Sequence, residues 1–306
     1  QLTSVPAEIG QLMSLVELDL NGNQLTSLPA EIGNLTSLKE LDVSSNELKK
    51  FPLEIGKLTE LNVLDLTKNA QLKRVPRAIG ELRARGCTVR LDPDVTIEGS
   101  EPAPPPKPTP KPEPKPEPKP VAPADVHVDA DEEIGFLSLW RSGDELLTSH
   151  WPDDEIESGT WKGVEFDSDR RVVTLDLSGL AKAGDIFGIE KTKSLVVPAE
   201  IRRLTSLQTL KLGNNLLTSL PQQIGQLVKL KELDLRGNKL TNVPACIQQL
   251  TSLKKLLLGR NQIMNIPAWI RQLTSLEKLY LNGNKLTSLP AEIWQLTALR
   301  ELYLND

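Results

Sequence analysis

A set of apolar positions recurs along most of the chain with the same internal spacing. In residues 25–46 these positions are Leu25, Leu28, Ile32, Leu35, Leu38, Leu41 and Val43. Neither a helical period nor strict alternation fits the whole set. Its last part alternates as a strand does, which places Leu41 and Val43 on the inner side. The outer side then receives Glu40, Asp42 and Ser44. The pattern predicts a coil made of one short strand and one short helical turn.

Asparagine and proline mark the length of this coil. The asparagines lie at steps of 23 residues, at Asn23, Asn46 and Asn69 and again at Asn215, Asn238, Asn261 and Asn284. Prolines keep nearly the same step, at Pro6, Pro29, Pro52 and Pro76 and again at Pro198, Pro221, Pro244, Pro267 and Pro290. Proline has no N–H to lose at the start of a turn, and asparagine can bond the backbone of a bend. Because one coil cannot bury its apolar edge alone, the pattern predicts stacked coils with a parallel sheet.

The repeated segment Leu25-Thr-Ser-Leu-Pro-Ala-Glu-Ile32 resembles the leucine-rich repeat family in its form of about 23 residues, with a Leu-Pro-x-x-Ile motif. The resemblance covers residues 2–92 and about 172–305. It implies an α/β fold of the leucine-rich repeat solenoid type. We expect two curved arrays, each with a concave parallel β-sheet and short helical or 3-10 segments on the convex side.

A proline-rich segment divides the two arrays. Twelve of the 23 prolines lie between Pro102 and Pro123, mostly alternating with Lys and Glu. This composition predicts a solvated polyproline II spacer of roughly 70 Å, with a ligand for an SH3-type domain as the alternative. The predicted domains are the first array with its C-terminal cap (1–97), the linker (98–124), an N-terminal cap (125–171) and the second array (172–306). Both ends fall inside a repeat, so we expect a fragment.

The cap sequence does not repeat. Two short helices broken at Ser142-Gly143 are expected, followed by the Trp161-Lys-Gly-Val164 strand. The order resembles the amino-terminal cap of plant and protist leucine-rich repeat proteins, without the cysteine pair of plant extracellular examples. Its aromatic residues are expected in the core of the cap: Phe136, Trp140, Trp151, Trp161 and Phe166. Cys87 and Cys246 are too few for a disulfide framework, and we expect a buried free thiol at Cys87.

Composition argues against several function classes. The net charge of −5 does not favour nucleic acid, and a mean hydropathy of −0.26 without a long apolar run predicts no membrane span. The two histidines, His127 and His150, lack metal-binding spacing, and no phosphate-binding loop is present. We therefore expect no catalytic residues, no metal and no cofactor. The prediction is that the protein is not an enzyme.

The outward side of the predicted sheets holds the candidate binding residues. The two tyrosines of the chain, Tyr280 and Tyr303, occupy one equivalent strand position, and exposed aromatic groups beside cations resemble a binding hot spot. The other candidates in the second array are Leu257, Lys255, Lys278, Lys211, Glu232, Asp234 and Arg236. In the first array they form an acidic strip of Glu17, Asp19, Glu40, Asp42 and Asp65.

These observations predict a non-enzymatic scaffold that binds a protein or peptide on the concave faces, with avidity if both arrays engage. Two alternatives stay open. The chain could be the regulatory or recognition arm of a larger enzyme or receptor, or a structural or surface matrix protein. The missing cap cysteines favour the cytoplasm, and the cell surface or exterior remains a second location.

Overall fold

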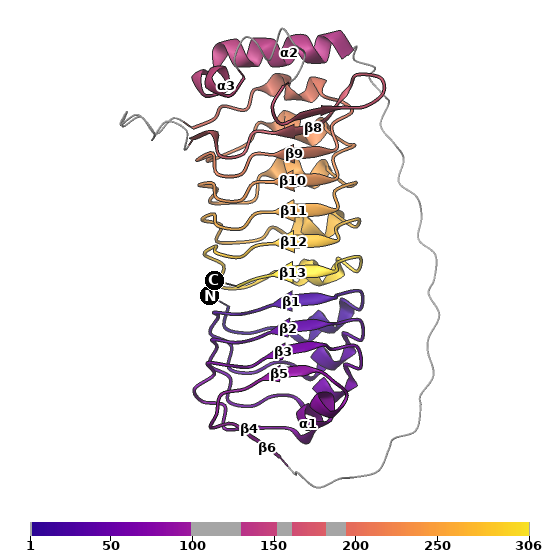
Figure 1. Cartoon of the computed structure of the whole chain (residues 1–306), viewed down its shortest axis with the longest axis vertical. Helices are drawn as coiled ribbons and strands as arrows, with labels where there is room; N and C mark the ends of the chain where they lie inside the picture. Colours follow the sequence, from indigo (N-terminus) through magenta and orange to yellow (C-terminus); the bar gives the residue numbers. More distant parts are fainter. Residues whose placement is uncertain (1, 99–129, 152–160, 182–193, 306) are drawn as a thin grey trace.

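The computed structural model describes residues 2–98, 130–151, 161–181 and 194–305 (Figure 1). Its strands are β1 (Glu17–Asp19), β2 (Glu40–Asp42), β3 (Val63–Asp65), β4 (Arg74–Val75), β5 (Thr88–Arg90), β6 (Thr96–Ile97), β7 (Val164–Phe166), β8 (Val172–Asp176), β9 (Thr209–Lys211), β10 (Glu232–Asp234), β11 (Lys255–Leu257), β12 (Lys278–Tyr280) and β13 (Glu301–Tyr303). Three α-helices are described, α1 (Arg77–Ala84), α2 (Ala130–Gly143) and α3 (Glu145–His150). None of the described helices has the length and apolar character needed to cross a membrane.

A single turn of 3-10 helix follows the proline in each regular coil. These turns are η1 (Ala7–Gln11), η2 (Ala30–Asn34), η3 (Leu53–Lys57), η5 (Ala199–Arg203), η6 (Gln222–Gln226), η7 (Ala245–Gln249), η8 (Ala268–Gln272) and η9 (Ala291–Gln295). In η2, the preceding Pro29 is extended (φ −70°, ψ 154°), and Ile32 is completely buried. The turn ends at Leu35, whose N–H donates to the Ile32 carbonyl over 3.2 Å. Proline thus sets the start of the turn, and isoleucine holds it on the core.

The asparagines form the expected ladder between coils. Asn46 Nδ2 donates to the Val43 carbonyl of its own coil (3.0 Å) and to the Leu20 carbonyl of the preceding coil (2.9 Å). Its Oδ1 accepts the Leu25 N–H over 3.0 Å. Each such asparagine satisfies backbone groups that no strand partner reaches, which is why it is buried. Ser44, expected on the outer side, is only 5% exposed, because its hydroxyl donates to Asp42 Oδ1 and accepts from the neighbouring coil.

The two arrays form one sheet. The spatial order of its eleven strands is β5-β3-β2-β1-β13-β12-β11-β10-β9-β8-β7, so the last strand of the described chain lies beside the first. β1 and β13 are parallel, with Leu18 opposite Leu302 and Asp19 opposite Tyr303. We call this junction the seam. The order of the strands in the chain is therefore a circular permutation of their order in space (Figure 1).

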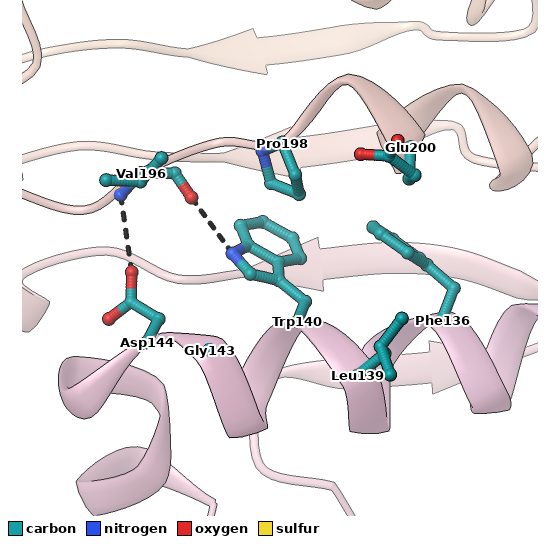
Figure 2. Close-up of a pocket in the computed structure, with 8 residues that line it drawn as sticks. All are labelled: Phe136, Leu139, Trp140, Gly143, Asp144, Val196, Pro198 and Glu200. Carbon is teal, nitrogen blue, oxygen red and sulfur yellow. Dashed lines mark hydrogen bonds between the residues drawn. The ribbon is translucent and has the colours of Figure 1, made fainter.

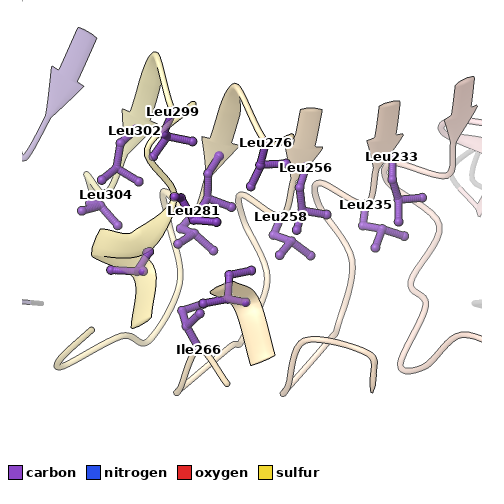
Figure 3. Packing of buried hydrophobic residues seen from close by; sticks show 14 of the residues in the cluster. Leu233, Leu235, Leu256, Leu258, Ile266, Leu276, Leu281, Leu299, Leu302 and Leu304 are labelled. Carbon is purple, nitrogen blue, oxygen red and sulfur yellow. The ribbon is translucent and has the colours of Figure 1, made fainter. Parts of the chain in front are cut away.

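One hydrophobic core runs through the whole stack without a break at the seam. Strand leucines such as Leu233, Leu256 and Leu302 repeat in register along it, and Figure 3 shows this ladder from β10 to β13. Only the pairing of β7 with β8 is antiparallel in this sheet. A stack of this kind buries its apolar edges only through neighbouring coils, as expected for a repeat solenoid.

The segment for which we predict an N-terminal cap contains two helices, α2 and α3, beside the β7–β8 pair. Glu133 of α2 is completely buried. Its carboxylate accepts from Arg171 Nε at 3.0 Å and from the Val172 N–H at 2.7 Å, which ties the helix to β8. Trp151 and Trp161 pack edge to face with ring centroids 5.0 Å apart, and both are buried as predicted. The buried Glu133 is thus a polar connection between α2 and β8.

The other end of the sheet differs from the regular coils. The expected last strand forms as β5, but an α-helix, α1, replaces the 3-10 turn before it. Its sequence continues as Leu82-Arg-Ala84 where the coil of η2 has Leu35-Thr-Ser37, and Arg and Ala are better helix formers than Thr and Ser. Gly86, at φ +99°, then turns the chain out of the helix. Strands β4 and β6 pair beyond it, a feature that the repeat pattern does not predict.

Some predictions concern segments outside the described residues. The proline-rich spacer with its SH3-type alternative and His127 belong to these segments, and they stay predictions. Cys87 and Cys246 are free and buried, as expected for Cys87. Burial raises the pKa of the Cys87 thiol, and that of Cys246 to about 11, so both thiols are protonated at neutral pH.

Candidate functional site

The first and third residues of β1–β3, β5 and β9–β13 lie on the side of the sheet that the 3-10 turns do not cover; in the longer β8, the residues in register with them are Thr174 and Asp176. We call this side the open face. From β8 to β5 the first-position column reads Thr174, Thr209, Glu232, Lys255, Lys278, Glu301, Glu17, Glu40, Val63 and Thr88. The third-position column reads Asp176, Lys211, Asp234, Leu257, Tyr280, Tyr303, Asp19, Asp42, Asp65 and Arg90. Thirteen of the fourteen predicted binding residues occur in these columns; the exception is Arg236, which follows β10 and pairs with Asp234.

The two tyrosines stack beside each other on the open face. The ring centroids of Tyr280 and Tyr303 are 4.4 Å apart, with the planes tilted by 47°. Each hydroxyl donates to a glutamate of the next strand over 2.6 Å: Tyr280 to Glu301, and Tyr303 to Glu17. Burial, followed by the hydrogen bond and negative charge of Glu301, raises the pKa of Tyr280 to about 12. The same causes with Glu17 raise the pKa of Tyr303. Both rings are therefore neutral and held in place.

The cations near the tyrosines are matched by carboxylates. Lys255 Nζ lies 3.1 Å from Glu232, Arg236 lies 2.7 Å from Asp234, and Lys278 pairs with Glu301. Lys211 pairs with Asp176 over 3.2 Å. Between β8 and β13 the open face is thus largely neutralised, and the predicted row of lysines is not a free cationic surface.

Within the acidic strip, only the negative charge of Asp65, on β3, is balanced by an ion pair in the described part of the chain. Asp65 pairs with Arg90 over 3.2 Å, whereas among the described residues no Lys or Arg forms an ion pair with Glu17, Asp19, Glu40 or Asp42. Burial is the main cause that raises the pKa of Asp19, to about 6; the Asn21 N–H opposes this shift and the charge of Asp42 adds to it. Negative charge therefore accumulates over β1 and β2.

The seam brings the acidic strip and the tyrosine pair together. Tyr303 lies opposite Asp19 in the register, and its hydroxyl crosses the seam to Glu17. These groups stand 286 residues apart in the chain, so the sequence analysis treats them as two separate surfaces.

Two predicted residues are less accessible than expected. Leu257 is only 7% exposed and Asp234 only 4%, because neighbouring side chains of the same columns cover them. Asp176 and Arg90 join the site through their ion pairs, although the sequence analysis does not include them. We take the accessible centre of the open face to be Tyr280, Tyr303 and the acidic residues of β1.

A separate apolar pocket of about 260 Å³ lies where the cap meets the next coil (Figure 2). Phe136 and Trp140 stack with centroids 5.7 Å apart, and the Trp140 indole N–H donates to the Val196 carbonyl over 2.9 Å. Asp144 accepts the Val196 N–H over 3.4 Å. These bonds fix the pocket walls as part of the cap. Among the described residues no group of His, Cys, Asp and Glu is arranged to hold a metal ion.

Comparisons with known proteins place these features in context. A sequence model described as leucine-rich repeat region matches residues 1–84 and 189–306. A solved leucine-rich repeat protein of Leptospira interrogans is 27% identical, with 99% of this chain and 70% of that chain covered and a TM-score of 0.35. A chain of the BIR3–SERK2 complex of Arabidopsis thaliana is 28% identical. The match covers 53% of this chain and 87% of that chain, with a TM-score of 0.41.

A third structure is the ectodomain of the Arabidopsis thaliana receptor kinase GASSHO1/SCHENGEN3 in complex with Casparian strip integrity factor 2. It is 22% identical to this chain, and the match covers 99% of this chain with a TM-score of 0.38. This chain spans about a third of that one, 34%. A search of curated proteins finds no match.

Proposed function

We propose, from the premise that this chain belongs to the leucine-rich repeat family, that it is a non-enzymatic interaction scaffold that binds a protein or peptide on the open face. The observation that carries this proposal is the tyrosine pair. Tyr280 and Tyr303 are the only tyrosines of the chain, and both lie side by side near the middle of an eleven-stranded sheet. Tyrosine is among the residues that contribute most to protein–protein binding.

The rigidity of the site supports binding. Each tyrosine hydroxyl is already bonded to a glutamate, so little side-chain entropy remains to be lost when a partner docks. The carboxylates of β1 and β2 next to the rings favour Lys or Arg in the partner, since complementary charge raises the association rate and specificity. A partner that contacts the tyrosines would therefore meet an apolar centre bordered by negative charge.

Several finer assignments belong to the same proposal. We infer repeats of the 23-residue Leu-Pro-x-x-Ile type, a cap of the plant and protist kind before β8, and a signalling or assembly role. The domain boundaries at residues 97, 124 and 171 and the linker as an SH3-type ligand are proposals too. The regulatory-arm and surface-matrix alternatives stay predictions, and no feature of the described residues favours them over binding.

Selection from a random peptide library displayed on phage tests the proposal. Peptides selected on the wild-type protein should bind the Tyr280→Ala/Tyr303→Ala variant at least tenfold more weakly in equilibrium titrations. The enriched peptides should carry Lys or Arg beside an apolar residue.

Two controls separate binding from folding. Tyr280→Phe/Tyr303→Phe keeps both rings and should keep the affinity within about threefold. Leu53→Ala/Met264→Ala removes exposed apolar groups that lie outside the strands and should not change it. Equal peptide affinity for the Ala variant and the wild type, with both folded by circular dichroism, would show that the open-face tyrosines are not the binding site.

A further inference from the structure

The seam has the same contacts as a junction within either array. The N–H groups of Val16 and Glu17 donate to the Arg300 carbonyl over 2.8 and 2.9 Å. The Leu304 N–H donates to the backbone carbonyl of Asp19 over 2.8 Å. One coil further, the N–H groups of Lys39 and Glu40 donate to the Val16 carbonyl in the same way, over 2.8 and 3.1 Å. Asn23 Nδ2 also reaches across the seam to the Leu304 carbonyl over 3.1 Å. The geometry of strand pairing is therefore that of any two successive repeats.

The covalent path across the seam is different. No loop joins β13 to β1. The described chain leaves the first array after β6, and residues 99–129 connect it to α2 at the opposite end of the sheet. Eleven strands at about 4.8 Å spacing put these ends roughly 50 Å apart. About 30 residues span at most roughly 100 Å when fully extended, so the connection is long enough to leave the seam free to open.

Each side of the seam presents apolar residues that only the other array shields from water. On the first array this face contains Leu2, Ile9 and Leu18, all at most 2% exposed in the closed stack. On the second array it contains Leu302 and Ile293, which are completely buried. η1 and η9 pack against each other there. If the seam opened, both faces would meet water, and a solenoid end without a cap is unstable in solution.

We propose that the seam is an exchangeable interface, through which β13 of one copy of this chain pairs with β1 of a second copy. The partner is a second copy because it offers the complementary face in the same register. Two copies that exchange their arrays form two seams, each with the contacts of the closed monomer, so the seam faces of both copies are covered. This is a domain exchange. It does not depend on the proposed binding function.

Mass action sets which form prevails. Within one copy, the linker keeps the two faces at an effective concentration in the millimolar range for a short flexible connection, and lower for a longer one. A dilute solution should therefore contain monomer. Refolding at high protein concentration should trap the exchanged dimer, because opening a formed seam exposes the apolar faces again.

Cysteine pairing across the seam tests the exchange on the full chain. Glu17 and Glu301 are directly opposed in β1 and β13, at a separation of strands that a disulfide can bridge. We would mix Glu17→Cys and Glu301→Cys chains, unfold and refold them together at about 100 μM, and oxidise them. A covalent dimer of about twice 33.8 kDa is expected on a non-reducing gel.

The matched control mixes Glu17→Cys with Glu40→Cys. These positions are opposed in the same way in β1 and β2 but belong to one unbroken array, so no covalent dimer is expected above the wild-type background. A single chain with Glu17→Cys and Glu301→Cys should close its disulfide within the monomer, which shows that the geometry permits the bond. If that bond forms but the mixed chains give no more dimer than the control, the proposal is wrong.

A measurement without substitutions guards against misfolding of the variants. Wild-type protein refolded at about 5 and 300 μM should show by light scattering a dimer fraction that rises at least fivefold and persists after dilution. A mass that stays monomeric at both concentrations would overturn the exchange.

Discussion

Burial and local partners shift the pKa values of two equivalent aspartates, two repeats apart, in opposite directions. Asp19 and Asp65 occupy the same column of the open face. Burial raises the pKa of Asp19 to about 6 and Asp42 adds to the shift. At Asp65, burial acts in the same direction, but hydrogen bonds from Thr67 and Arg90 and the charge of Arg90 outweigh it and lower the pKa. The ionised side chain is thus unfavourable at one site and favourable at the other.

Substitution of Asp19 should stabilise the protein at pH 7. The folded protein holds the Asp19 proton more tightly than the unfolded chain does. The stabilising contribution of Asp19 to the free energy of unfolding is therefore greatest below about pH 4 and is lost as the pH rises towards 6. Asp19→Asn, which can still accept the Asn21 N–H, removes this cost. We expect a gain of about 1 kcal/mol after allowance for solvent screening, seen as a Tm higher by roughly 2–4 °C in calorimetry.

The control is Asp65→Asn. Because the folded pKa of Asp65 is lowered, its stabilisation is present above the unfolded pKa and lost in acid, so this variant should melt lower than wild type at pH 7. Between pH 7 and 5, wild type should gain stability from Asp19 and Asp19→Asn should not. A lower Tm for Asp19→Asn at pH 7 would contradict this account.

At the scale of elements, the close stacking of η2 on η3 depends on Gly33. A Cβ added at Gly33 in η2 would lie 2.5 Å from the Glu54 carbonyl oxygen of the next coil, because the turns of successive coils approach at the backbone. Gly135 in α2 has no atom within 4 Å of such a Cβ. The same residue type therefore has a packing role in one element and none in the other.

Alanine substitution at these two glycines should act in opposite directions. Gly33→Ala forces two coils apart, and we expect a loss of about 1–3 kcal/mol, as for other overpacked sites. Gly135→Ala replaces a poor helix former at an open position and should stabilise by up to about 1 kcal/mol. Urea denaturation measures both. Equal effects of the two substitutions would refute the role of close turn packing.

At the scale of the whole molecule, the seam couples two parts of the chain that are joined covalently only through residues 99–129. Asn23 and Asn46 make the same kind of ladder bonds, but Asn23 bonds Leu304 across the seam whereas Asn46 bonds Leu20 within one array. Loss of either leaves buried backbone groups unpaired, at a cost of about 1–3 kcal/mol for each such group.

Asn23→Ala should therefore weaken the coupling between the arrays, and Asn46→Ala should not. Hydrogen exchange followed by mass spectrometry is expected to show faster exchange at the seam amides of Glu17 and Leu304 in Asn23→Ala. In Asn46→Ala the increase should appear within the first array, at the Leu25 amide that bonds Asn46, and the Leu304 amide should exchange as in wild type. Identical exchange patterns in the two variants would mean that the seam is not a distinct point of opening.

The sequence by itself determined the repeat. Its apolar spacing, the proline before each turn and the ladder asparagine act within one coil or between adjacent coils, so their effect is local and readable. The strand Glu40–Asp42 and the buried Ile32 follow from it. The buried Trp151 and Trp161 follow from a separate segment that does not repeat. The coil of α1 departs from the pattern where Arg83 and Ala84 stand in place of Thr and Ser.

Only the tertiary structure decided how the two arrays meet. Every coil has nearly the same apolar edge, so the sequence does not state which end of one array stacks on which end of the other. Pairing of β13 with β1 settles this, and it places Tyr303 beside Glu17 and Asp19. The candidate site depends on that contact because its aromatic and acidic parts come from opposite ends of the chain and become neighbours only across the seam.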